Sequence, residues 1–170
     1  MAFVVETGQG SGDSNSYASV SDADAYFAER NVADWVGSDD EKQAWLIRAT
    51  DYIDARFGSR FIGQRKTQEQ ALEWPRSGID GIAEDVIPRG LQRACMEYAV
   101  RTKTSPLAPD IQMDESGMVR GVSSKSVGPL SVSYSAASSG IGSTVSLFRP
   151  YPAADMLLSG LLNTVNRVIR

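Results

Sequence analysis

Residues 58–76 combine basic side chains with aromatic ones, which is the pattern with the clearest binding chemistry in the chain. The basic residues are Arg60, Arg65, Lys66 and Arg76, and the aromatic ones are Phe61 and Trp74. Guanidinium and ammonium groups bind phosphate or carboxylate, and an exposed ring beside them can stack on a base. Tryptophan and arginine are also enriched in protein interfaces. The pattern predicts a contact surface for a partner protein or nucleic acid; the alternative is a solvated loop held by Trp74.

No set of residues has the composition of a catalytic or metal site. The sequence contains no histidine, which is the commonest general base and metal ligand. Its one cysteine, Cys95, has the spacing of a small core residue in a helix. The run Gly8-Gln9-Gly10-Ser11-Gly12-Asp13 lacks the Gly-Lys-Ser/Thr ending of a phosphate loop and favours a flexible arm. We therefore expect no enzyme, no cofactor and no metal.

The basic loop follows the strongest helix pattern of the sequence. Ser38 and Glu41 have the spacing of a capping box, and apolar residues then recur on one face as far as Phe57. Gly58 is a typical residue to end such a helix. Residues 58–87 show no convincing periodic element, and a loop of this length in a small domain is usually functional or disordered. Its apolar residues favour an ordered, functional loop.

Two further helices are expected around this one. Ser21 has the position of an N-cap for a short helix that reaches about Asn31. Pro88 suits the first turn of a third helix, because its missing N–H is not needed there. This helix should end near Lys103.

The sequence changes character after Asp110. Residues 119–134 alternate around Gly128-Pro129, which predicts two short strands and a turn. Residues 135–146 are rich in Ser, Gly and Ala and are typical of a link. Apolar side chains at helical spacing follow, namely Leu158, Leu161, Leu162, Val165 and Ile169. This stripe either completes the core or orders on a partner.

These patterns predict a mainly α fold: a small helical bundle with a long ordered loop, a short β-hairpin and an extended C-terminal segment. We expect an N-terminal arm at 1–17 and a helical domain at 18–134, with the hairpin near 119–134. A flexible link and a C-terminal docking segment should occupy 135–170. No apolar run approaches the ~20 residues of a membrane span, and the N-terminus lacks the pattern of a signal segment.

Charge is distributed unevenly along the 170 residues, whose formal net charge is −4. Residues 1–57 hold 11 acidic and 4 basic residues, whereas residues 58–170 hold 10 acidic and 13 basic ones. The net charge argues against bulk attraction to nucleic acid. The asymmetry suits a protein that has two different neighbours.

Three stretches, taken in order, carry a resemblance to a known family. They are Val5-Glu6-Thr7-Gly8 with Asn15-Ser16-Tyr17 and Asp22-Ala23-Asp24-Ala25-Tyr26-Phe27, then Arg48-Ala49-Thr50-Asp51-Tyr52-Ile53-Asp54, then Arg65-Lys66-Thr67 leading to Leu72-Glu73-Trp74-Pro75-Arg76. The sequence resembles the head–tail connector proteins of tailed bacteriophages, also called adaptor or head-completion proteins. Many of these are catalogued as DnaT-like single-stranded DNA-binding proteins. The similarity covers residues 3–135, with a weaker similarity at residues 151–162.

The resemblance implies a structural virion protein without enzymatic activity. Its copies would form a homo-oligomeric ring under the portal protein, sharing the portal's twelvefold symmetry, and would bind a downstream tail or stopper protein. Genomic double-stranded DNA would pass through the lumen without sequence-specific binding, which a net negative chain suits. The location implied is the head–tail junction of the virion, after viral assembly in the host cytoplasm and without a membrane.

Two groups of site residues follow as hypotheses. Portal binding is assigned to Tyr151, Leu157, Leu158, Leu161, Leu162 and Val165. Subunit or tail contact is assigned to Arg60, Arg65, Lys66, Trp74 and Arg76. The alternative function is single-stranded DNA binding through the loop from Arg60 to Arg76, with Phe61 and Trp74 as stacking platforms.

Overall fold

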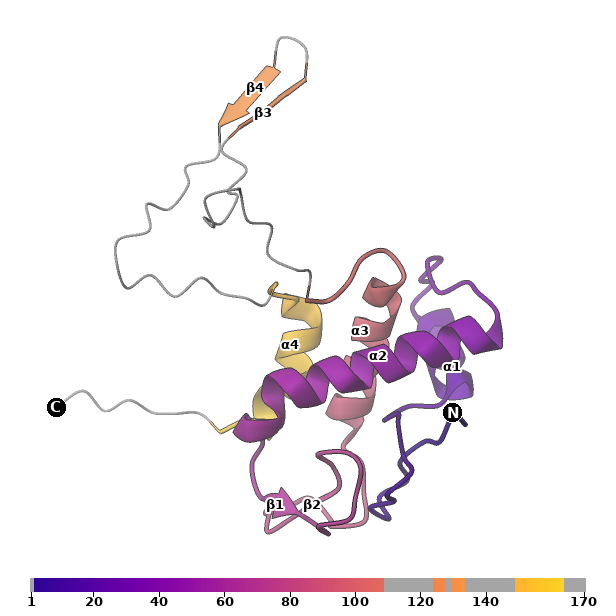
Figure 1. Cartoon of the computed structure of the whole chain (residues 1–170), viewed down its shortest axis with the longest axis vertical. Coiled ribbons are helices and arrows are strands. Elements are labelled where there is room, and N and C mark those ends of the chain that lie inside the picture. The colour runs from indigo at the N-terminus through magenta and orange to yellow at the C-terminus, as the bar shows by residue number, and fades with distance from the viewer. Residues whose placement is uncertain (1, 109–123, 128–129, 134–148, 164–170) are drawn as a thin grey trace, which may run out of the picture. The chain divides into compact units, whose positions relative to one another are not determined.

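The computed structural model describes residues 2–108, 124–127, 130–133 and 149–163. These residues belong to two units: a helical unit from residues 2–107 and 150–163, and a hairpin unit within residues 108–149. Helices dominate the described residues, which confirms the predicted mainly α fold (Figure 1).

The central element is α2, Asp39–Phe57, which packs along α3 and also contacts α1. Its predicted capping box is confirmed: Ser38 Oγ accepts from the Glu41 N–H, and the Glu41 carboxylate accepts from the Ser38 N–H at 2.8 Å. Gly58 is the C-cap, as predicted. The buried face of α2 is largely apolar and packs this helix into the core. Because the loop begins where α2 ends, this packing also fixes where the loop starts.

Helix α1, Val20–Glu29, precedes α2 in the sequence, and helix α3, Arg89–Thr102, follows the loop after α2. The predicted N-cap of α1, Ser21, is wrong, because Ser19 accepts from the Asp22 N–H at 3.0 Å and Ser21 lies inside the helix. Pro88 is the N-cap of α3 and Lys103 its C-cap, close to the predicted limits. Cys95 is fully buried in α3, and burial raises the pKa of its thiol to about 11.

The C-terminal helix α4, Pro152–Leu158, completes the core of the helical unit. It packs against α3 and continues as the 3₁₀ helix η2, Ser159–Leu161. The apolar spacing predicts a helix that begins near Leu158. The α-helix instead begins at Pro152, a residue that suits a first turn, and ends at Leu158. The backbone of Leu162 is extended. The sequence predicts a separate link and docking segment at 135–170, whereas residues 150–163 belong to the same unit as residues 2–107.

The hairpin unit contains β3, Ser124–Val127, and β4, Leu130–Ser133. The two strands are antiparallel, with Val127 opposite Leu130. This is the short hairpin expected within residues 119–134. The link expected at residues 135–146 lies outside the described residues.

The long loop between α2 and α3 is built from short elements. The 3₁₀ helix η1, Gly58–Arg60, is followed by β1, Gln64–Arg65, which pairs antiparallel with β2, Arg76–Ser77. The N-terminal residues lie beside this loop at the lower end of the helical unit in Figure 1.

One half-buried carboxylate joins the N-terminal residues, α2 and the loop. Asp54 of α2 accepts a hydrogen bond from the Tyr17 hydroxyl at 2.6 Å and another from the Glu73 N–H at 3.0 Å. The same hydroxyl accepts from the Trp74 N–H at 3.2 Å. Burial raises the pKa of Asp54 to about 6, although both hydrogen bonds to the carboxylate lower it.

The pKa of Asp54 predicts how stability depends on pH. The folded-state pKa of about 6 lies above the ordinary aspartate pKa of 3.8, so the folded protein binds this proton more tightly than the unfolded chain does. The stability that Asp54 contributes is therefore fully present below pH 3.8 and is lost as the pH rises through the folded-state pKa of about 6. The shift corresponds to roughly 3 kcal/mol.

The test compares the free energy of unfolding of the wild type with that of Asp54→Asn. We expect the difference, wild type minus variant, to fall by up to ~3 kcal/mol as the pH rises from about 4 to about 7. Urea denaturation, monitored by tryptophan fluorescence, measures the free energy of unfolding of each protein. Asp13→Asn, which changes an exposed carboxylate, is the matched control. A difference that stays constant, or one that grows with pH, would contradict this account of Asp54.

Candidate functional site

The glycine-rich run at the N-terminus surrounds a carboxylate of its own chain. Glu6 is 2% exposed, and its carboxylate oxygens accept hydrogen bonds from the backbone N–H groups of Gly8, Gly10 and Ser11 at N···O distances of 2.9, 3.0 and 3.0 Å. Gly8 and Gly10 have φ angles of +97° and +74°, which other residues rarely adopt. The backbone donors that could hold a phosphate are thus already bonded to Glu6.

The same run is tied to the loop, in contrast to the flexible arm expected from its composition. Lys66 Nζ donates to the Gly8 carbonyl at 3.0 Å, and the Ala71 N–H donates to the Ser11 carbonyl at 3.0 Å. A Cβ at Gly8 would lie 1.9 Å from the Asp85 carbonyl oxygen, so the chain approaches this loop too closely for a side chain. The N-terminal residues therefore form one structure with the loop.

Most of the residues assigned to subunit or tail contact make internal contacts. Arg76 is 8% exposed; its guanidinium donates to the Ile62 and Gly63 carbonyls at 2.8 and 3.0 Å and pairs with Glu73 at 2.9 Å. Arg65 donates to the Gln70 carbonyl. Arg60 is exposed, with its guanidinium 5.7 Å from the centre of the Phe57 ring.

Both aromatic residues of the loop are buried. Trp74 is 0% exposed and Phe61 is 2% exposed, and their rings meet edge to face with centroids 5.8 Å apart. A ring in this position packs the core. Neither side chain can stack on a base without leaving its place.

The residues assigned to portal binding also lie mainly in the core. Tyr151, Leu158 and Leu161 are buried, Leu157 and Leu162 are half-buried, and Val165 lies outside the described residues. Tyr151 packs its ring against those of Tyr52 and Tyr98, with centroids 6.2 and 5.8 Å away. Its hydroxyl donates to the Leu107 carbonyl at 3.3 Å.

Asp155, which holds α4 in place, is not among the site residues predicted from the sequence. The Arg56 guanidinium donates to both of its carboxylate oxygens at 3.2 Å. The Tyr98 hydroxyl and the Tyr151 N–H donate to the same carboxylate. A signal was present, because Asp155 is the one charged residue of the sequence between positions 150 and 166.

The structure brings together the two groups of residues that the sequence analysis assigned to different partners. Phe61 and Leu162 form an antiparallel bridge. The Ile62 N–H donates to the Leu161 carbonyl at 3.0 Å, and the Asn163 N–H donates to the Arg60 carbonyl at 2.7 Å. The start of the loop and the C-terminal segment therefore form one continuous structure.

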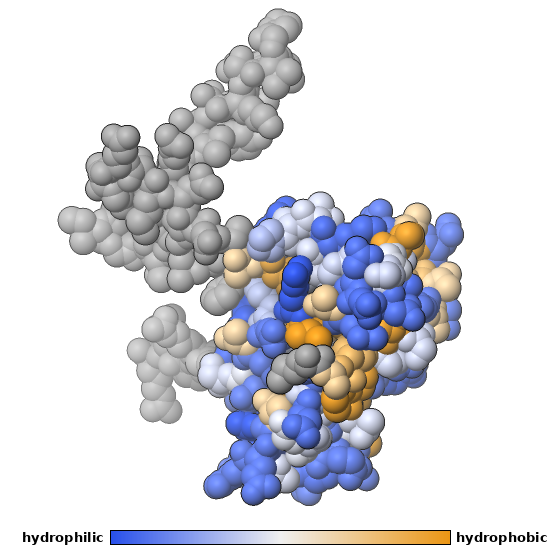
Figure 2. All heavy atoms as spheres, turned by 45° about the vertical axis from the view of Figure 1, so that its right-hand side comes forward, coloured by the Kyte–Doolittle hydropathy of each residue, from blue (hydrophilic) through white to orange (hydrophobic). Residues whose placement is uncertain are grey.

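The described surface offers little apolar area for docking. Three large apolar residues in the described part are clearly exposed, and they come from separate segments: Val36 (66%), Val86 (46%) and Met156 (74%). On the face in Figure 2, hydrophilic residues surround the hydrophobic ones. Among the described residues, no group of three or more His, Cys, Asp or Glu side chains is placed to bind a metal. None of the described helices combines the length and apolar character of a membrane span.

Comparison with known families gives one match. A family model described as "Putative DnaT-like ssDNA binding protein" matches residues 1–170. The chain therefore belongs to this family, which confirms that part of the resemblance seen in the sequence. No curated protein and no solved structure matches the chain.

The packing of α4 gives a test of the helical unit. Leu158→Ala should lower the free energy of unfolding by roughly 2–5 kcal/mol, because it leaves a cavity against α3. Met156→Ala on the same helix should change it by no more than ~0.5 kcal/mol, because Met156 is exposed. Chemical denaturation of both variants measures this. Equal stability of the two would show that α4 does not contribute to the core.

Proposed function

We propose that the protein is a structural component of a tailed-phage particle. In this role, copies of the chain form a homo-oligomeric ring between the portal and the tail, complete the head and let DNA pass. The proposal joins the connector resemblance of the sequence to one observation: the residues that carry the resemblance are used for internal contacts. Glu6, Tyr17, Asp54, Lys66 and Trp74 all lie in the hydrogen-bonded and packed region between the N-terminal residues, α2 and the loop. A rigid building block needs such contacts.

Single-stranded DNA binding is the second candidate, and the description of the family favours it. Such binding usually combines a positively charged groove with exposed aromatic rings. In the loop, Phe61 and Trp74 are buried, while Lys66 and Arg76 donate to backbone carbonyls. The chain also carries a net charge of −4. The loop therefore supports base stacking poorly.

The hairpin unit supports an assembly role. Among the described strands, β3 and β4 pair with each other alone, and each has four residues. A two-stranded hairpin is at best marginally stable in water by itself. Among the described residues neither strand has a second neighbour, so its outer edge offers backbone donors and acceptors that can pair with another chain. Contact with a neighbouring copy or with the tail would satisfy these groups.

Particle composition tests the proposal directly. We expect quantitative mass spectrometry of purified virions to find this chain at about one copy per portal subunit, because neighbours in a shared closed ring are equal in number. Particles made without this chain should lack tails. Absence of the chain from virions, together with its presence in infected-cell extract, would overturn the proposal.

An oligonucleotide separates the two candidate functions. The fluorescence anisotropy of a labelled oligothymidine should stay flat on addition of the protein at low salt, since the loop offers no exposed ring for stacking. An increase that weakens steeply with salt would instead support DNA binding. Arg60→Ala is the informative variant in that case, because Arg60 is the exposed guanidinium at the start of the loop.

A further inference from the structure

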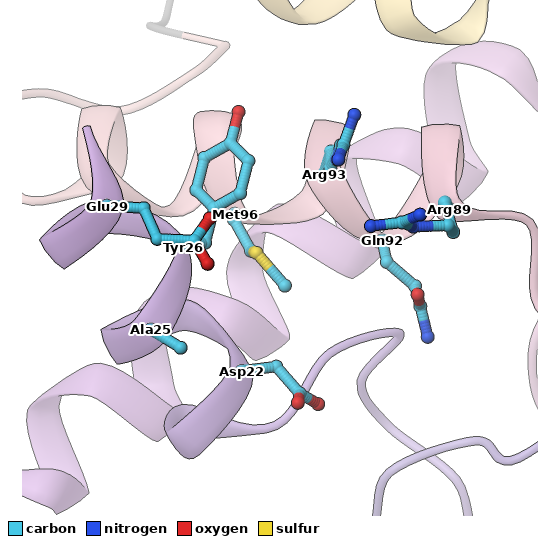
Figure 3. Close-up of a pocket in the computed structure, with 8 residues that line it drawn as sticks. All are labelled: Asp22, Ala25, Tyr26, Glu29, Arg89, Gln92, Arg93 and Met96. Carbon is cyan, nitrogen blue, oxygen red and sulfur yellow. The ribbon is translucent and has the colours of Figure 1, made fainter.

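A pocket of about 270 Å³ lies between α1 and α3. Figure 3 shows side chains of α1 facing those of α3 across it. Arg89, Gln92 and Arg93 line the α3 side, and the buried Met96 lies beside them. Asp22 and Glu29 line the α1 side. Most of the lining residues are polar, and Ala25 and Met96 are the apolar ones, which suits a small polar group from a partner.

The two arginines of this pocket differ from most basic residues of the helical unit. Lys42, Arg56, Arg76 and Arg101 each pair with a carboxylate. The guanidiniums of Arg89 and Arg93 make neither an ion pair nor a hydrogen bond with any described residue. They are four residues apart on one helix, so their side chains lie on the same face.

The acidic side chains across the pocket already have partners. Asp22 accepts from the Ser19 hydroxyl at 2.6 Å, and Glu29 pairs with Arg30 at 3.4 Å. Among the lining residues, the guanidiniums of Arg89 and Arg93 thus face two carboxylates that already have other partners. Two unpaired guanidiniums beside an amide are suited to bind carboxylate or phosphate oxygens. The pocket therefore fits an anionic group.

The chain also displays unpaired carboxylates on a rigid element. Asp39 and Asp40 are exposed in the first turn of α2, and neither side chain has a partner among the described residues. They cannot reach the pocket of their own molecule. Lys103, at the end of α3, donates to the Asp34 and Val36 carbonyls, so the start of α2 lies at that end. Arg89 is at the other end of α3, ~20 Å away along a helix of this length.

We propose that the α1–α3 pocket binds the acidic first turn of α2 from a second copy of this chain. Arg89 and Arg93 of one copy pair with Asp39 and Asp40 of the next. The two surfaces lie at opposite ends of α3, so the contact is heterologous, the type from which closed rings are built. This inference rests on the proposed ring function, to which it adds the contact between neighbours.

Disulfide trapping tests the contact even when it is brief. The variant that combines Asp40→Cys with Arg93→Cys should form covalent multimers under mild oxidation, because each copy carries both halves of the contact. Either substitution alone can give only dimers. The matched control combines Asp40→Cys with Arg48→Cys, since Arg48 is also an exposed arginine without a partner. The native Cys95 is fully buried and stays outside the reaction.

We expect the Asp40–Arg93 pair to cross-link about tenfold faster than the control pair, and the rate to fall as salt rises. A second experiment reverses charges in the variant that carries Asp40→Cys and Arg93→Cys. Arg89→Glu should slow cross-linking, Asp39→Lys should also slow it, and the two together should restore it, because the new charges are again opposite. Arg48→Glu should leave the rate unchanged.

Rates equal to those of the control pair, or no restoration by the double charge reversal, would overturn the proposal. Oligothymidine binding that depends on Arg89 and Arg93, without selective trapping, would also overturn it and assign the pocket to phosphate. Virion composition keeps the two proposals separate. A chain present at the portal's copy number but not trapped refutes this contact alone, whereas selective trapping of a chain absent from virions refutes the connector function alone.

Discussion

The arrangement of the helical unit depends on the half-buried carboxylate of Asp54. Burying a charged group is unfavourable unless hydrogen bonds replace its water. Here the donors come from Tyr17 and from the Glu73 N–H. Because those donors lie in segments far apart in the sequence, the carboxylate is satisfied only when the N-terminal residues, α2 and the loop are assembled together. The raised pKa shows that these bonds compensate the burial only in part.

Asp155 has the same role for α4. Its carboxylate receives both arms of the Arg56 guanidinium and the Tyr98 hydroxyl, so one residue links α4 to α2 and α3. Bidentate pairing of this kind fixes orientation as well as distance. The apolar side chains of α4 supply burial, while Asp155 determines how α4 lies on the other helices. A short helix of seven residues would hardly form without such contacts.

The sequence predicts local structure well here and predicts contacts between distant segments poorly. The capping box at Ser38, the stop at Gly58 and the start at Pro88 each depend on neighbouring residues, and all three are confirmed. The internal use of Lys66 and Arg76 depends on carbonyls that only the folded loop brings near. Composition alone could not distinguish these internally bonded cations from cations that are free to bind a partner.

The proposed contact between copies depends on charges that the fold leaves unpaired. A solvated arginine loop and a binding loop have the same composition, but the structure bonds Lys66 and Arg76 of this loop internally and leaves Arg89 and Arg93 unpaired. Unpaired charges on a rigid helix can select a partner through complementary charge at little cost in side-chain ordering. In an acidic chain, copies of the same protein are the nearest source of such carboxylates. The sequence-level charge asymmetry thus has a physical counterpart at the two ends of α3.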